Sequence, residues 1–131
     1  ELVERSGKLN DEVDRAMNNL QFSKALESIW DYIGLVNKYV EISKPWVLAK
    51  ELSEKNKLNE VLYNLAESIR IISSFILPFM PNVAAEMRKQ LGLSSEKEPV
   101  ENDFMWGGMS SGTKICKGSP IFPKLEHPTV N

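Results

Sequence analysis

The sequence has one cysteine and one histidine among its 131 residues, and this scarcity excludes several kinds of chemistry. Cys116 has no partner for an internal disulfide, which fits a reducing cytosol. The two residues cannot supply the four ligands of a zinc site. His127 lies beside Pro128 near the end of the chain, so a Cys-His or Ser-His catalytic pair would have to be built from that end. The sequence gives no support to metal or nucleophilic catalysis.

Nucleotide-binding motifs and long apolar runs are also missing. No Gly-x-x-x-x-Gly-Lys-Ser/Thr run is present, and no Gly-x-Gly-x-x-Gly follows a strand pattern. The longest apolar stretch, residues 69–80, is interrupted by Arg70, two serines and Pro78, and it is too short to cross a bilayer. We therefore expect no cofactor in this chain, no catalysis by the chain alone and no membrane contact.

Positive charge is scarce overall but locally concentrated. The net charge of −2 argues against a protein that binds nucleic acid by bulk electrostatics. Residues 37–57 nevertheless carry five lysines against three glutamates, and residues 113–125 carry three lysines and no acid. On charge alone, an ordinary solvated surface is the better explanation of such patches. The charge pattern permits RNA binding without requiring it.

Apolar residues at helical spacing predict an all-α fold. A chain of this length, 42% apolar and 26% charged, is expected to form one domain over residues 1–131. Four apolar positions from Leu9 to Leu20 predict a first helix, with residues 1–7 either part of it or a frayed lead-in. A broad apolar stripe predicts a core helix over about 22–41, and we interpret its Trp30 as a packing residue.

The rest of the chain predicts three further helices and a tail. We expect a short helix over 46–51, a polar link over 53–57, a long helix over 58–76, and a helix that starts at Pro81 and stops at Gly92. The bundle core would span about residues 9–92. Residues 93–126 are rich in Ser, Gly and Pro and predict a short irregular or extended tail packed on the bundle. The competing interpretation is a linker to a further domain.

The junction after the second helix is the strongest candidate site. Proline disfavours helical geometry in the residue before it, so the helix should end near Ile42 and another should begin around Pro45. Trp46 then lies on a corner with Lys38, Lys44 and Lys50 nearby in sequence. A large aromatic beside amines can stack on an unpaired base while the amines approach phosphates. Residue type and position alone favour the plainer interpretation, that Trp46 fills the gap between two helices.

Several motifs in the right order resemble one family. Residues 22–27 (FSKALE), 37–40 (NKYV) and 45–50 (PWVLAK) resemble the C-terminal helical domain of bacterial methionyl-tRNA synthetases. The similarity continues through VLYNL at 61–65, RII at 70–72 and PFMP at 78–81. It ends with WG at 106–107, GTK at 112–114 and PIFPKLE at 120–126. The resemblance covers about residues 12–126.

This resemblance implies an anticodon-binding helix bundle of the class I type, which holds the CAU anticodon loop of methionine tRNA. The family's Pro-Trp tryptophan stacks on anticodon bases and here matches Trp46, which reverses the preference for packing. Pro45 would set the angle of this platform. On position more than on a family rule, we expect polar and phosphate contacts from Asn37, Lys38, Lys44 and Lys50. The parent would be a cytoplasmic ligase of protein synthesis that uses ATP, with magnesium, and methionine in its own catalytic domain.

Two features of the family pattern are missing. Its Asn and Arg, four residues apart on the domain's first helix, have no match here, since Asn10 and Asp14 have the spacing but the wrong second residue. We expect that this first helix is lacking. The catalytic motifs His-Ile-Gly-His and Lys-Met-Ser-Lys-Ser are absent, so the catalytic domain is lacking too. The alternative function is a helical adaptor that docks proteins through Trp46 and Leu48. The resemblance sets no oligomeric state.

Overall fold

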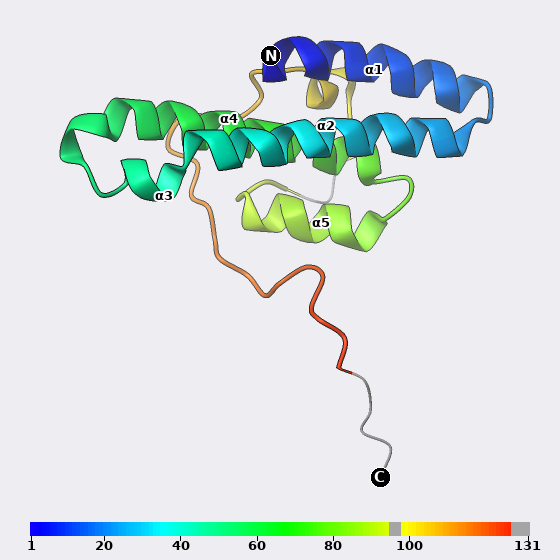
Figure 1. Ribbon diagram of the computed structural model, residues 1–131. Helices are drawn as coiled ribbons and strands as arrows, with labels where there is room; N and C mark the ends of the chain where they lie inside the picture. The colour runs from blue at the N-terminus through cyan, green and yellow to red at the C-terminus, as the bar shows by residue number, and fades with distance from the viewer. Residues whose placement is uncertain (95–97, 127–131) are drawn as a thin grey trace.

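The computed structural model describes residues 1–94 and 98–126, which form an all-α bundle (Figure 1). The long helices α1 (Leu2–Asn18), α2 (Phe22–Ser43) and α4 (Lys55–Ile76) pack side by side, and α5 (Pro81–Gln90) packs on α4. A one-turn helix α3 (Pro45–Leu48) and two 3₁₀ turns, η1 (Leu52–Glu54) and η2 (Glu101–Phe104), complete the elements. These described residues contain no strand, so the predicted all-α class is confirmed. His127 and Pro128 lie outside them.

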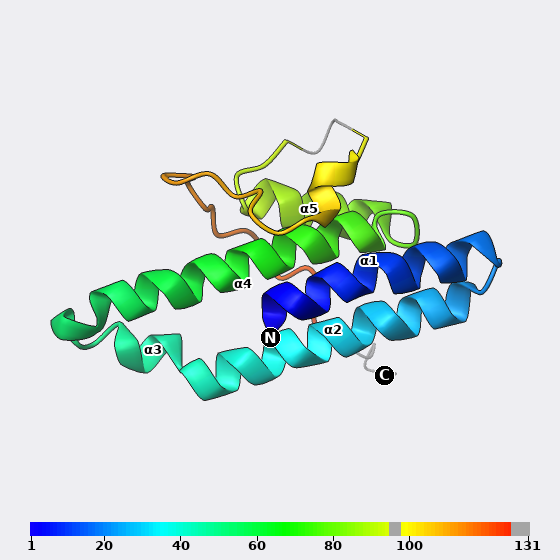
Figure 2. The same cartoon turned by 90° about the horizontal axis from the view of Figure 1, so that it is seen from above.

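Helix α1 extends to the start of the chain. It begins at Leu2 and runs through Gly7, so of the two alternatives for residues 1–7 the structure has the helix, and with Leu2 buried the core begins before residue 9. Its buried residues Leu2, Leu9, Val13 and Ala16 share one face, as an amphipathic helix requires. Viewed from above, α1 lies along α2, and the turn between them is at the opposite end of the bundle from α3 (Figure 2).

Helix α2 buries a different part of its apolar stripe from the one we predicted. Its buried residues are Ala25, Ile29, Tyr32 and Val36, at spacings of four, three and four. Trp30 is 50% exposed, so our interpretation of it as a packing residue is wrong. The stripe is wider than the surface that α1 and α4 cover, and its Trp30 side is left at the edge of the core.

The predicted corner after α2 is confirmed. Helix α2 ends at Ser43, Lys44 takes the left-handed conformation with φ 44° and ψ 62°, and Pro45 is the first residue of α3. The Lys44 carbonyl accepts hydrogen bonds from the N–H groups of Val47 (2.8 Å) and Leu48 (3.3 Å). Helix α3 stops at Leu48, so the predicted extent to residue 51 is wrong. The polar link to residue 57 is also wrong, because η1 occupies 52–54 and α4 starts at Lys55.

The predicted helices 58–76 and 81–91 correspond to α4 and α5. Pro81 is the first residue of α5, and Gly92 has φ +72°. The N–H of Gly92 donates to the Lys89 carbonyl (3.0 Å) and that of Leu93 to the Arg88 carbonyl (2.9 Å). This pair of bonds is a Schellman motif, and the predicted stop at Gly92 is confirmed.

The tail packs on the bundle core at its start, contacts α5 again at residues 116–119 and then leaves the helices. The ring of Phe104 lies against Phe75 with centroids 4.9 Å apart, and Trp106 also packs on the core. Further on, Ile115 is 61% exposed and Leu125 is 88% exposed, and the chain runs away from the helices (Figure 1). The first part of the tail thus packs apolar rings on the core, whereas Cys116 and Ser119 are held against α5 by hydrogen bonds with Gln90. Among the described residues, no helix has the length and apolar character that a membrane span needs.

Candidate nucleic-acid interface

Trp46 is presented to solvent on a stiff corner. The indole is 54% exposed, while Pro45 beside it is partly buried. The proline ring fixes one backbone angle, and the left-handed Lys44 fixes the direction in which α3 leaves α2. Within residues 1–94 and 98–126 the indole N–H of Trp46 has no hydrogen-bond partner. A flat aromatic surface is therefore available to a ligand at this end of the bundle.

Two lysines flank this aromatic surface. Lys44 precedes Pro45 directly and Lys50 follows α3, and both side chains are exposed. In the part of the chain that the structure describes, neither ammonium group forms an ion pair, because the pairs present involve other residues. Both charges are free to meet an anion. Amines next to an exposed aromatic are the arrangement that single-stranded nucleic acid favours.

Asn37 and Lys38 lie on α2 before the corner, on two sides of the helix. Asn37 lines an apolar groove of about 440 Å³ between α2, α4 and α5. Lys38 lines a separate cavity of about 310 Å³ with Tyr39 and Asn64. Neither space is lined by Trp46. The structure thus brings Lys44, Pro45 and Trp46 together, whereas Asn37 and Lys38 diverge from each other.

The groove beside Asn37 is nearly free of polar groups. Trp30 lines it from α2, Ile69 from α4 and Met87 from α5, with Phe122 of the tail at the same site. Among the described residues that line it, Asn37 is the one polar side chain apart from the Trp30 N–H. The sequence analysis missed this surface because it assigned Trp30 to the core. The signal was the width of the apolar stripe on α2, which exceeds what one side of a helix buries.

A buried ion pair fastens the start of the tail to α4. The Glu67 carboxylate accepts hydrogen bonds from the backbone N–H groups of Gly107 (2.6 Å), Gly108 (2.7 Å) and Met109 (2.9 Å). Arg70 donates to the same carboxylate at 2.6 Å and 3.2 Å. Its guanidinium also donates to the carbonyls of Asp103 (2.9 Å) and Met105. We call this arrangement of Glu67, Arg70 and residues 103–109 the tail clasp.

The electrostatics of the tail clasp favour the ionised carboxylate. Glu67 is fully buried and Arg70 is 3% exposed. Burial alone would raise the pKa of Glu67, but hydrogen bonds from Arg70 and from the backbone of Gly108 and Met109 outweigh it and hold this pKa below its ordinary value. Gly108 is required here, because a Cβ atom would lie 2.5 Å from the Arg70 guanidinium carbon. The sequence analysis did not find this clasp.

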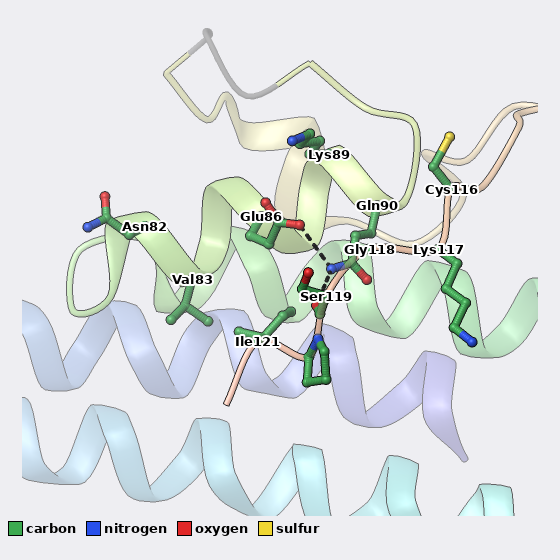
Figure 3. Close-up of a pocket in the computed structure, with 11 residues that line it drawn as sticks. Asn82, Val83, Glu86, Lys89, Gln90, Cys116, Lys117, Gly118, Ser119 and Ile121 are labelled. Carbon is green, nitrogen blue, oxygen red and sulfur yellow. Dashed lines mark hydrogen bonds between the residues drawn. The ribbon is translucent and has the colours of Figure 1, made fainter. Parts of the chain in front are cut away.

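A larger cavity, of about 580 Å³, separates α5 from the tail (Figure 3). The Gln90 amide nitrogen lies between the Glu86 carboxylate (3.0 Å) and the Ser119 carbonyl (3.2 Å) and donates to both. The exposed Cys116 lies at one side, and its N–H donates to the Gln90 carbonyl at 2.8 Å. None of the six predicted site residues lines this cavity. The hydrogen bonds of Gln90 hold the tail along α5, and the cavity is separate from the corner.

Comparison with known proteins places the chain among parts of tRNA ligases. Residues 1–107 match the family model described as the anticodon-binding domain of tRNA ligase. The methionine–tRNA ligase of Caldanaerobacter subterraneus is 40% identical over 126 residues, covering 96% of this chain and 20% of that protein. The corresponding ligase of Bacillus subtilis is 39% identical over 113 residues, covering 86% and 17%. The chain spans about a fifth of the length of these curated relatives.

Solved structures agree with the sequence comparison. The chain is similar to the apo form of Mycobacterium tuberculosis methionyl-tRNA synthetase, with a TM-score of 0.87 and 26% identity over 97% of this chain and 26% of that one. A second structure of that synthetase, in complex with methionyl-adenylate, gives a TM-score of 0.69 and 25% identity over 95% of this chain and 26% of that one. The bundle described above is therefore found within a much longer protein.

Proposed function

Because the chain belongs to the family of anticodon-binding domains of tRNA ligases, we propose that it recognises the anticodon of methionine tRNA for a methionine–tRNA ligase. In this proposal the CAU anticodon loop binds at the α2–α3 corner. Trp46 stacks on an anticodon base, Pro45 sets the angle of the indole, and Asn37 supplies a polar contact from α2. Lys38, Lys44 and Lys50 approach phosphates of the loop.

The observation that supports this proposal most directly is the exposure of Trp46. Trp46 is 54% exposed, so a base that covers its ring would remove apolar surface from water, and the ring is held on a corner with two free ammonium groups beside it. Stacking of one base on an aromatic side chain contributes about 1–3 kcal/mol. The lysines add a share that falls as salt rises. The mechanism of this domain is binding, without any covalent step.

The reaction itself belongs to a part of the parent protein outside this chain. We propose that the parent is a cytoplasmic ligase that joins methionine to tRNA with ATP and magnesium in a catalytic domain. The names of the relatives support this parent activity, and one solved relative holds methionyl-adenylate. This chain's own residues would bind the anticodon loop and hold the tRNA in a fixed position relative to that catalytic domain.

The adaptor alternative gains no support. The relatives described above are tRNA ligases. Leu48, which the adaptor hypothesis paired with Trp46 in a docking patch, is partly buried at the end of α3. The adaptor hypothesis predicts binding that is nearly independent of salt, whereas RNA binding weakens steeply as salt rises.

A fluorescence titration with RNA hairpins tests the proposal. The chain is titrated with a stem-loop that carries the CAU anticodon and with one that carries a changed anticodon. The Trp46→Ala variant should bind the CAU loop roughly 5- to 150-fold more weakly, the equivalent of losing one stacked base. Phe22→Ala is the matched control, since Phe22 is similarly exposed at 49% but begins α2, whereas the corner follows the end of that helix. Equal affinity of the wild-type chain for both loops, or equal loss in both variants, would refute recognition through Trp46.

A further inference from the structure

Two tyrosine hydroxyl groups connect α2 to α4. The Tyr32 hydroxyl donates to Ser68 Oγ at 3.3 Å, and Asn64 Nδ2 donates to the Tyr39 hydroxyl at 3.0 Å. The tyrosines are seven residues apart on α2, and their partners are four residues apart on α4. Each pair therefore lies on one face of its helix, and the two bonds fix how α2 and α4 align. The first bond is fully buried, while the second lies nearer the corner.

The Tyr39–Asn64 bond holds the last turns of α2. The carbonyl of Tyr39 accepts a hydrogen bond from Ser43 Oγ at 2.6 Å, and Ser43 is the final residue of the helix. The next residue, Lys44, donates its N–H to the Val40 carbonyl at 3.0 Å. A displacement of Tyr39 relative to α4 therefore moves the helix end from which the corner departs. Trp46 follows two residues after Lys44.

The start of the tail lies across a cavity from this bond. Trp106 is partly buried and lines the same cavity of about 310 Å³ as Tyr39 and Asn64. The tail clasp fixes the neighbouring Gly107, whose N–H donates to Glu67, three residues along α4 from Asn64. The tail, the end of α2 and the middle of α4 thus meet at one level of the bundle.

We propose that Tyr39 and Asn64 are positioning residues for anticodon binding. Their hydrogen bond fixes the end of α2 on α4 and so sets the direction in which the α2–α3 corner presents Trp46. This inference rests on the proposed function, because it concerns how the same binding site is oriented. Neither residue has to touch the RNA, since both act through the position of the corner.

Hydrogen exchange tests the effect on the corner without RNA. The amides of Val47, Ala49 and Lys50 are hydrogen-bonded within the corner and report its opening. Tyr39→Phe removes the hydrogen bond between Asn64 and the Tyr39 hydroxyl, and this loss should speed the exchange of the three amides about three- to tenfold. Tyr32→Phe is the matched control, because it removes the other hydroxyl bond and should leave corner exchange unchanged. Equal corner exchange in the two variants would overturn the inference.

RNA binding then separates positioning from direct contact. Tyr39→Phe should weaken binding to the CAU hairpin about three- to tenfold, and its effect should be clearly smaller in a Trp46→Ala background, where only the lysines of the corner remain to be displaced. Asn64→Leu should weaken binding in the same way. Asn64→Asp should keep binding near the wild-type level, because the Tyr39 O–H can donate to the new carboxylate. A full additional loss in the Trp46→Ala background would overturn positioning in favour of direct contact. Absence of Trp46-dependent binding in the wild-type chain would instead refute the proposed function, and the exchange result would still decide whether the bond holds the corner.

Discussion

Lys44 has two roles at the corner that oppose each other. Its backbone adopts φ 44°, a conformation that costs L-residues about 1–2 kcal/mol, while its side chain supplies a charge next to Trp46. Lys44→Gly should therefore stabilise the fold by roughly 0.5–1 kcal/mol and weaken RNA binding several-fold. Urea denaturation and hairpin titration measure the two effects. Lys50→Gly removes a charge without relieving a left-handed residue, so stability should not rise there. A loss of stability in Lys44→Gly would contradict this division of roles.

The tail clasp depends on the negative charge of the Glu67 carboxylate. Glu67→Gln should destabilise the fold by about 3–5 kcal/mol, because it leaves the buried Arg70 without its anion. Denaturant unfolding followed by circular dichroism measures the change. The control is Glu4→Gln, whose ion pair with Lys8 is exposed and whose loss should produce no measurable change. Similar stability of the two variants would show that the clasp adds nothing to the folded state.

The same carboxylate makes the clasp sensitive to acid. The folded-state pKa of Glu67 is lowered, so its contribution to stability is fully present above the unfolded pKa of about 4.3 and is lost as the pH falls through the folded value. The exchange of the Gly107, Gly108 and Met109 amides should therefore accelerate on acidification below about pH 4.3, relative to the acid dependence of unbonded amides. Protection of these amides that persists through this range would contradict a clasp held by the ionised carboxylate.

At the scale of elements, two glycines give opposite predictions for the same substitution. Gly92 ends α5 with φ +72°, and a Cβ there would lie 2.3 Å from the Lys114 carbonyl oxygen, so Gly92→Ala should destabilise the fold by about 1 kcal/mol or more. Gly34 lies inside α2 with open space around it, so Gly34→Ala should stabilise by about 0.5–1 kcal/mol. Thermal unfolding of the two variants should shift the midpoint in opposite directions.

The sequence predicted the elements where spacing and proline leave little choice. Helical periodicity identified α2 and α4, and Pro45 and Pro81 marked the starts of α3 and α5. The side of α2 that faces the core was harder, because apolar residues occupy more of its circumference than its neighbours cover. Tyr32 is buried and Trp30 is half exposed, and the pattern of hydrophobicity ranks them the other way round.

In the candidate site, too, the features set by adjacent residues were predictable from the sequence, and those set by residues far apart were not. The corner under Trp46 depends on adjacent residues and was predictable. Asn37 and Lys38 were grouped because they are neighbours in sequence, but successive helix residues point about 100° apart, and the structure places them on two sides of α2. The tail clasp joins Glu67 to backbone N–H groups forty residues away, and backbone donors have no sequence signature.

For the whole molecule, the net charge of −2 limits how the chain can bind RNA. With no basic excess, salt dependence should come from the few lysines near the corner. Three phosphate contacts by Lys38, Lys44 and Lys50 give a slope of log K against log salt of roughly −2 for single-stranded RNA. Titrations of the CAU hairpin across salt concentrations measure this slope, and replacing all three lysines with glutamine should bring it near zero. A slope several times steeper would indicate a larger basic surface elsewhere on the bundle.

The tail clasp has a consequence for the order in which the molecule comes apart. The cost of removing an ion pair from water falls on warming, while the stabilisation from apolar contacts levels off. Heating therefore spares the Glu67–Arg70 attachment relative to the apolar contacts of α1 with α2, and acid removes the attachment first. The two treatments should produce different partly unfolded forms of one small domain, one with a loosened helix pair and a closed clasp, the other with an intact helix pair and an open clasp.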